Sequence, residues 1–158
     1  MVTGLYDAER QCAWKLLMEM SDRKAVVGDG DNQVPFEGEL LVESLDSLYQ
    51  FHQKTRELME ELPVDLLHAG HRPPVLLRIF TDIRQALRPF LETWHADYRY
   101  WWSHLSNEKV PPKARQLTYD RKQAFLEAWT YLRRRMRKIR AELLDAYELP
   151  DPMATQAD

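Results

Sequence analysis

Residues 132–141 read Leu-Arg-Arg-Arg-Met-Arg-Lys-Ile-Arg-Ala, with six cations in the eight positions 133–140. Leu132, Met136 and Ile139 lie four and three residues apart, so an α-helix places them within about 60° of one another. Apolar residues continue this spacing on both sides, and the whole seam is Leu117, Ala124, Phe125, Ala128, Leu132, Met136, Ile139, Leu143 and Tyr147. The pattern predicts a long, basic last helix, from about Pro112 to Tyr147, that buries one face.

Three more amphipathic stretches precede this helix. They span about Tyr6 to Met20, Glu39 to Leu62, and Pro73 or Pro74 to Leu105. A proline in the first turn of a helix loses no helical hydrogen bond, which suits the start of the third stretch. Pro89 lies inside that stretch and is expected to kink the helix, because its ring removes one backbone hydrogen bond.

The segments between the helices are rich in helix-breaking residues. Asp22 to Gly38 holds three glycines and a proline, Pro63 to Pro74 is a second irregular stretch, and Asn107 to Pro112 is a turn. No alternating β pattern is present. The sequence predicts an all-α fold, an antiparallel four-helix bundle with a kinked long third helix and a long basic fourth helix. We expect one domain over residues 1–149, a flexible tail over 150–158, and a core that includes Leu45, Leu48, Ile83, Trp94, Trp101, Phe125, Leu132 and Ile139.

Length and composition favour a single globular domain. The chain has 158 residues, 44% of them hydrophobic and 30% charged, and one cysteine, Cys12, which we expect to be a small buried apolar residue. No apolar run approaches the ~18–20 residues that cross a bilayer, and the N-terminal residues do not resemble a signal peptide. We therefore expect a cytoplasmic protein that does not enter membranes.

Charge is strongly segregated along the chain. Lysine and arginine number 6 against 14 acidic residues in positions 1–70, 16 against 6 in positions 71–140, and 0 against 5 in positions 141–158. Such segregation carries information about partners rather than about the fold.

The arginine-rich helix is the first candidate binding surface. On a helical wheel Arg134, Arg137 and Lys138 point away from the apolar seam, and Arg133, Arg135 and Arg140 flank it. Two interpretations stay open. The cations either pair with carboxylates of this protein or of a second copy, such as Glu57, Glu60 and Glu61, or they bind a nucleic-acid backbone or another polyanion. Arginine outnumbers lysine, which favours bidentate contacts with carboxylate or phosphate.

One flank of the third helix is the second candidate. Trp94, Tyr98, Trp101 and Leu105 are expected in the core, whereas the adjacent flank carries Arg84, Arg88, His95, Arg99 and Trp102. Cations with an interleaved aromatic residue suit contacts with bases and phosphates. The same residues suit a rim where two helices pack through amphipathic side chains, and we favour this packing interpretation.

Arg88 and His95 are separated by six residues, which resembles the Arg-x(4–6)-His motif of the HEPN superfamily of helical-bundle ribonucleases. In that family the histidine and the arginine act on the scissile phosphate across a dimer interface. The resemblance covers eight residues, and Pro89 stands where the family usually has a polar residue. It implies a ribonuclease in which Arg88 and His95 are catalytic.

No metal or cofactor site is expected. His68 and His71, with Asp65 nearby, are interpreted as surface residues because a closed metal site needs further ligands. The segment Asp29-Gly-Asp-Asn lacks the glycine and the glutamate that a calcium-binding EF-hand loop requires, since Val34 and Leu40 occupy those positions.

Our leading hypothesis is a non-enzymatic helical scaffold or adaptor subunit whose last helix docks a polyanion, either a nucleic-acid backbone or an acidic protein face. One alternative is the HEPN-like ribonuclease using Arg88 and His95. Another is a self-associating structural protein whose acidic and basic faces pair with each other in an oligomer.

Overall fold

The computed structural model describes residues 2–28, 36–67 and 74–154, and these residues form helices joined by turns. The four long helices are α1 (Val2–Ser21), α3 (Leu41–Glu60), α4 (Val75–Tyr100) and α6 (Lys122–Tyr147). No β-strand occurs in the described part of the chain, so the predicted all-α class is confirmed.

Short helical segments connect the long ones. They are α2 (Lys24–Val27), the 3₁₀ turn η1 (Val64–Leu67), the π-helical turn η2 (Trp101–Leu105), α5 (Pro112–Arg115) and the 3₁₀ turn η3 (Gln116–Thr118).

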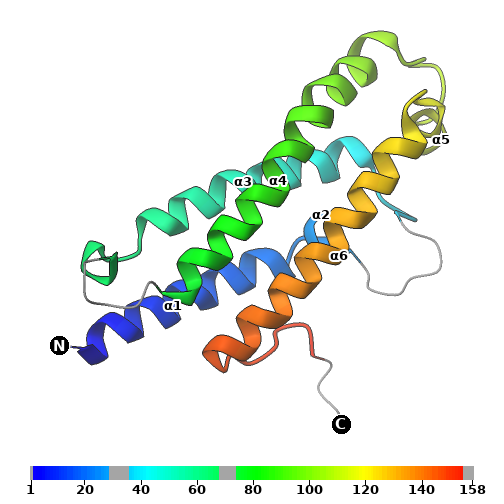
Figure 1. Cartoon of the computed structure of the whole chain (residues 1–158). Helices are drawn as coiled ribbons and strands as arrows, with labels where there is room; N and C mark the ends of the chain where they lie inside the picture. The colour runs from blue at the N-terminus through cyan, green and yellow to red at the C-terminus, as the bar shows by residue number, and fades with distance from the viewer. Residues whose placement is uncertain (1, 29–35, 68–73, 155–158) are drawn as a thin grey trace.

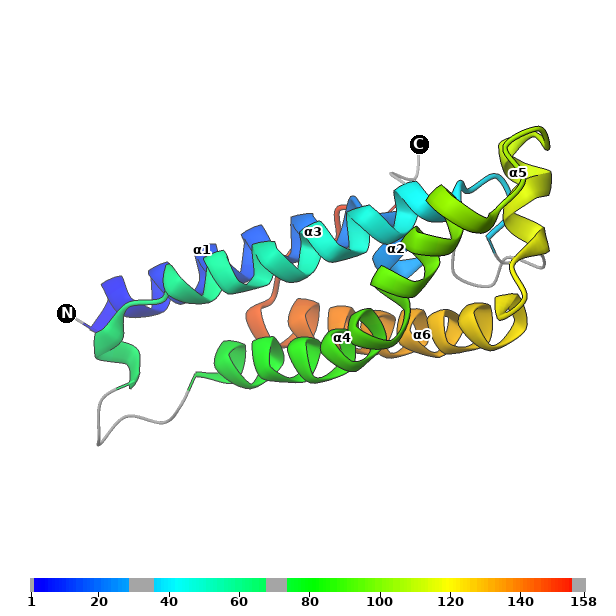
Figure 2. The ribbon, with the colours of Figure 1, turned by 90° about the horizontal axis from the view of Figure 1, so that it is seen from above.

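The long helices are arranged in two layers. Helices α1 and α3 lie side by side and run in opposite directions, and α4 and α6 do the same (Figure 1). Figure 2 shows α1 and α3 in one layer and the first half of α4 with α6 in the other, with α2 between the layers. Helix α4 bends along its length, and its second half turns toward α3. Pro89 lies near the middle of α4 and has no N–H to donate, which accounts for a bend there.

The predicted core is buried. All eight residues named as core from the sequence have at most 8% of their surface exposed: Leu45, Leu48, Ile83, Trp94, Trp101, Phe125, Leu132 and Ile139. Aromatic rings dominate the interface between α4 and α6, where Phe125 contacts Phe90, Trp94 and Tyr98. Cys12 is buried too, with its thiol donating to the Leu58 carbonyl at 3.3 Å. Burial raises the pKa of this thiol to about 11, as expected for a structural cysteine.

One loop prediction and one helix prediction need correction. The stretch 22–38 contains the short helix α2, whose Ala25, Val26 and Val27 are buried against the core. Three adjacent apolar residues can all be buried there because α2 lies between the two helical layers. The last long helix begins at Lys122 rather than near Pro112, since the residues between form α5 and η3.

Leu105 and Leu117 were predicted to be buried and are instead exposed. Leu105 ends the π-helical turn η2, and a π turn contains more residues than an α turn, which rotates Leu105 away from the stripe of Trp94 and Tyr98. Leu117 lies in a 3₁₀ turn, where side chains do not follow the α-helical period. In both places a local change of helix type interrupts the α-helical spacing of the apolar residues.

Two buried polar groups join distant helix ends. The Gln116 side chain accepts a hydrogen bond from the Leu41 N–H at 2.8 Å and donates to the Glu39 carbonyl at 2.9 Å. It thereby satisfies a free N–H group at the start of α3. The Tyr147 hydroxyl accepts from the Leu76 N–H at 2.7 Å at the start of α4. None of the helices in the described residues is both long enough and apolar enough to span a membrane.

Candidate functional site

Arg133 faces inward and is 95% buried, although the next residue, Arg134, is exposed. Its guanidinium donates to both carboxylate oxygens of Glu39, at 3.0 and 2.6 Å, and to the Ala25 carbonyl at 3.3 Å. The same group lies over the rings of Phe36 and Trp129, 4.1 and 5.1 Å from their centroids. Glu39 is also buried, so the two side chains neutralise each other's charge at a site where water does not solvate them. Arg133 therefore holds α6 to α2 and to the start of α3.

Arg137 and Arg140 also bind within the protein. Arg137, placed by the helical wheel on the outward arc, instead donates to the Val27 carbonyl at 2.8 Å. Arg140 donates to the Ser21 hydroxyl at 2.9 Å and forms an ion pair with Asp151. This ion pair lowers the pKa of the Asp151 carboxyl below its usual value. Three of the six cations thus stabilise the fold.

The predicted internal partners of the basic helix were wrong. Glu57, Glu60 and Glu61 pair instead with Lys54, Arg56 and Lys15, at 3.4, 3.5 and 3.1 Å. The carboxylate that does pair inside the core is Glu39, which lies two residues before the start of α3.

The other three cations of the run face outward. Arg134 and Lys138 are exposed and Arg135 is half-buried. In the part of the chain that the structure describes, none of the three forms an ion pair or a hydrogen bond. Unpaired positive charge therefore collects on one side of α6.

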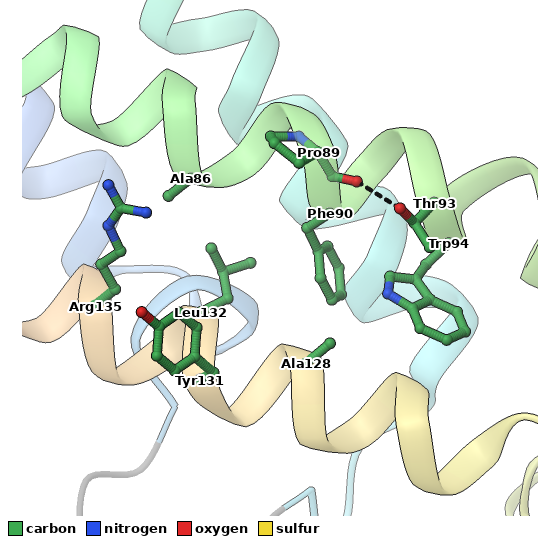
Figure 3. A pocket seen from close by; sticks show the side chains of 9 residues that line it. All are labelled: Ala86, Pro89, Phe90, Thr93, Trp94, Ala128, Tyr131, Leu132 and Arg135. Atoms are coloured by element: carbon green, nitrogen blue, oxygen red, sulfur yellow. Dashed lines mark hydrogen bonds between the residues drawn. The ribbon is translucent and has the colours of Figure 1, made fainter.

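A groove of about 350 Å³ lies between α4 and α6 beside these cations (Figure 3). Its lining is mostly apolar and consists of Ala86, Pro89, Phe90, Thr93, Trp94, Ala128, Tyr131, Leu132 and Arg135. The Thr93 hydroxyl donates to the Pro89 carbonyl at 2.8 Å, which leaves it without a hydrogen to donate to a ligand. Figure 3 shows Arg135 extending from α6 toward α4 at one end of the groove, near Ala86.

A second, larger hollow of about 700 Å³ lies on the other flank of α6. It is lined by Phe36, Lys122, Gln123, Leu126, Glu127, Thr130, Tyr131 and Arg134. Tyr131 lines both hollows and is 68% exposed. The outward face of α6 thus combines an exposed aromatic ring with unpaired cations.

The flank of α4 is used for packing in most positions. Arg99 forms an ion pair with Asp46 of α3 at 2.5 Å, and the Arg84 guanidinium approaches the His52 carbonyl and the Thr55 hydroxyl, each at 3.4 Å. Trp102 lies under the guanidinium of Arg115, 3.9 Å from the ring centroid. These contacts agree with the packing interpretation of this flank.

Arg88 and His95, the pair required by the ribonuclease alternative, have different surroundings. Arg88 is exposed and pairs with Glu92 of its own helix at 2.9 Å. The His95 ring stacks on Tyr49 of α3 at 4.6 Å, and its Nε2 lies 3.6 Å from Asp46. These contacts hold His95 in the interface between α3 and α4.

His52 belongs to the same interface and was not among the residues singled out from the sequence. Its Nε2 is buried and has no hydrogen-bond partner among the described residues. Burial lowers the pKa of His52, and the nearby guanidinium groups of Arg84 and Arg88 lower it further. The ring is therefore held in its neutral form near pH 7.

No group of three or more histidine, cysteine, aspartate or glutamate side chains within the described residues is arranged to hold a metal ion. His68, His71 and the segment 29–32 lie outside the described residues.

Sequence reasoning missed two residues that shape this surface. Glu39 was assigned to a helix without a partner, and Tyr131 was not singled out. Tyr131 precedes the arginine run directly, and an aromatic residue on the polar side of an amphipathic helix was the available signal.

No family model matches this chain, and no significant similarity to a curated protein or to a solved structure was found.

Proposed function

We propose that this protein is a non-enzymatic helical scaffold or adaptor that docks a polyanionic partner on the outward face of α6. The scaffold is an antiparallel four-helix bundle built from α1, α3, α4 and α6, and the docking residues are Arg134, Arg135 and Lys138. The observation that carries the proposal is that these three cations lie side by side without any carboxylate partner in the described chain.

Energetic reasoning supports a binding role for these cations. Like charges four residues apart on a helix repel one another by a few tenths of a kcal/mol, and Arg134 with Lys138 has this spacing. The inward cations offset such repulsion through Glu39 and Asp151, whereas the outward ones form no ion pair within the described residues. A polyanion supplies the missing negative charge, and arginine offers it two parallel hydrogen bonds per phosphate or carboxylate.

The HEPN-like ribonuclease remains an alternative without a supporting contact, because Arg88 is paired with Glu92 and His95 packs on Tyr49. Self-association remains a second alternative. In that case the basic face of one copy has to bind acidic residues of a second copy, such as Glu57 and Glu60. These carboxylates already have partners on their own helix.

The test is binding of fluorescein-labelled polyanions, namely single-stranded DNA, duplex DNA and polyglutamate, measured by fluorescence anisotropy at low and high salt. The R134Q/R135Q/K138Q variant removes the proposed contacts. The R56Q/K109Q/K113Q variant removes the same charge from exposed positions elsewhere and serves as the matched control.

We expect the parent and the control to bind at least one polyanion at low salt and the α6 variant to bind none. Equal affinity of all three proteins would show that the polyanion does not bind to the three cations of α6. An oligomer that dissociates in the α6 variant, with no polyanion bound by the parent, would support self-association instead.

A further inference from the structure

One aromatic residue and the three unpaired cations of α6 lie in one stripe along the helix. Tyr131, Arg134, Arg135 and Lys138 are spaced i, i+3, i+4 and i+7, which places them within about 100° around the helix. The stripe is about 10.5 Å long at 1.5 Å per residue. One aromatic ring therefore begins a row of three unpaired cations.

Tyr131 has the geometry of a stacking platform. At 68% it is more exposed than Tyr6, Tyr49 and Tyr100, and it borders a hollow on each side. In Figure 3 its ring lies at the α6 edge of the groove, beside Leu132 and Arg135. A ring with open space beside it can accept a second planar group, and such stacking tolerates any base because every base has a π-face.

The larger hollow also offers groups suited to a base edge. Gln123 donates to Glu127 at 3.2 Å, which leaves the Gln123 carbonyl and the second Glu127 oxygen free to accept. A carboxylate repels the phosphates of a nucleic acid as it repels the carboxylates of an acidic peptide, but only the nucleic acid offers exocyclic amino groups that donate to it. Among polyanions, Glu127 therefore favours one that carries nitrogenous bases.

From this arrangement we infer that the polyanion is a single-stranded nucleic acid, with one base stacked on Tyr131 and its phosphates on Arg134, Arg135 and Lys138. The inference rests on the proposed function and adds the class of partner. A duplex satisfies only the cations, because its bases are stacked on one another and present no free face to Tyr131. An acidic protein segment likewise satisfies the cations and leaves the ring without a planar partner.

The experiment compares Y131A, Y131F and Y100A by fluorescence anisotropy with three probes. The probes are a single-stranded DNA of A, C and T about 12 nucleotides long, within the ~4–16 nucleotides common for single-strand sites, a duplex of the same length, and polyglutamate. Y100A is the matched control because Tyr100 is also an exposed tyrosine on a long helix.

We expect Y131A to bind the single strand about 5- to 150-fold more weakly, the range found when one base–aromatic stack is removed. Y131F keeps the ring and should retain the affinity of the parent, as should Y100A. The affinity of Y131A for the duplex and for polyglutamate should stay within about twofold of the parent's.

Unchanged single-strand affinity in Y131A would overturn the inference, and so would an equal loss for all three probes. Binding of the duplex or polyglutamate but not of the single strand would also overturn it, while leaving the polyanion-docking function in place. Failure of the proposed function itself has a separate signature, which is full binding by R134Q/R135Q/K138Q.

Discussion

Arg133 and Arg134 are adjacent in the sequence, and the structure gives them opposite roles. Arg133 is buried and makes charged hydrogen bonds to both oxygens of Glu39, whereas Arg134 is exposed and has no ion pair within the described residues. Their positions on α6 differ by one 100° step. What separates them is whether another segment of the chain supplies a carboxylate, so a run of cations does not act as one unit.

The same contrast divides the whole run into two faces. Arg133, Arg137 and Arg140 point toward α2, the end of α1 and the C-terminal segment, where carbonyl, hydroxyl and carboxylate oxygens receive them. Arg134, Arg135 and Lys138 meet no such oxygen acceptor among the described residues. We therefore expect substitutions on the inward face to change the free energy of unfolding, and substitutions on the outward face to change binding.

The largest effect is expected for R133M. This change leaves the buried Glu39 carboxylate without its partner, and loss of one member of a buried ion pair typically costs about 3–5 kcal/mol. R134M, one residue away, should cost less than about 0.5 kcal/mol because the side chain is exposed. Urea denaturation measures both. Similar values for the two variants would contradict the division into two faces.

A double variant sharpens this prediction. R133M/E39L replaces the pair by apolar side chains and should recover much of the stability lost in R133M, because the uncompensated charge is gone. A double variant that is less stable than R133M would show that the uncompensated charge of Glu39 is not the main cause of the stability lost in R133M.

A smaller effect is expected for G28A. Gly28 has a φ of 67° and a ψ of −163°, a conformation that is essentially restricted to glycine, and an added Cβ lies 3.0 Å from Cδ of Arg133. We expect a loss of about 1–3 kcal/mol in urea denaturation. G38A separates the two causes, since Gly38 also has a positive φ but no atom within 4 Å of an added Cβ. A cost in G28A no greater than in G38A would show that the close approach of Arg133 does not matter.

The outward face should contribute little to stability. R134Q/R135Q/K138Q removes three mutually repelling charges, so the free energy of unfolding should change by less than about 1 kcal/mol. Circular dichroism and urea denaturation test this. A loss of several kcal/mol would mean that these cations stabilise the fold, and binding data from the variant would then lose their meaning.

The smallest effect concerns pH. The folded protein holds the pKa of His52 below its usual value, mainly by burial and also through Arg84 and Arg88. The unfolded chain therefore binds a proton more readily, and stability should fall as pH drops through about 6.5. Parent stability minus H52Q stability should decrease between about pH 8 and pH 5.5. A difference that is constant or increases as pH falls would contradict this sign.

Local patterns predicted much of the fold. The seam of Leu132, Met136 and Ile139 and the stripe of Ile83 and Trp94 follow from helical periodicity, and all of these residues are buried. The sequence failed where the helix changed type, as at Leu105, and where a short helix lay inside a glycine-rich stretch. Periodicity cannot detect a single turn, because too few residues define its period.

The candidate surface was predicted only in part. A helical wheel identifies which cations leave the seam, but it cannot identify which of them meet a partner from elsewhere in the chain. Arg133 depends on Glu39, 94 positions away, and Arg137 depends on a carbonyl 110 positions away. Such partners follow from tertiary packing, so Arg133 and Arg134 look alike in the sequence and differ in the structure.

The salt dependence of single-strand binding tests the central claim most directly. Each phosphate contact on a single strand contributes about −0.7 to the slope of log affinity against log salt concentration, so three outward cations contribute about −2. Measured by anisotropy titration, R134Q should reduce the steepness by about 0.7, and the R56Q/K109Q/K113Q control should leave the slope of the parent unchanged. A parent slope near zero, or a slope that changes equally in both variants, would contradict docking of a polyanion on the outward face of α6.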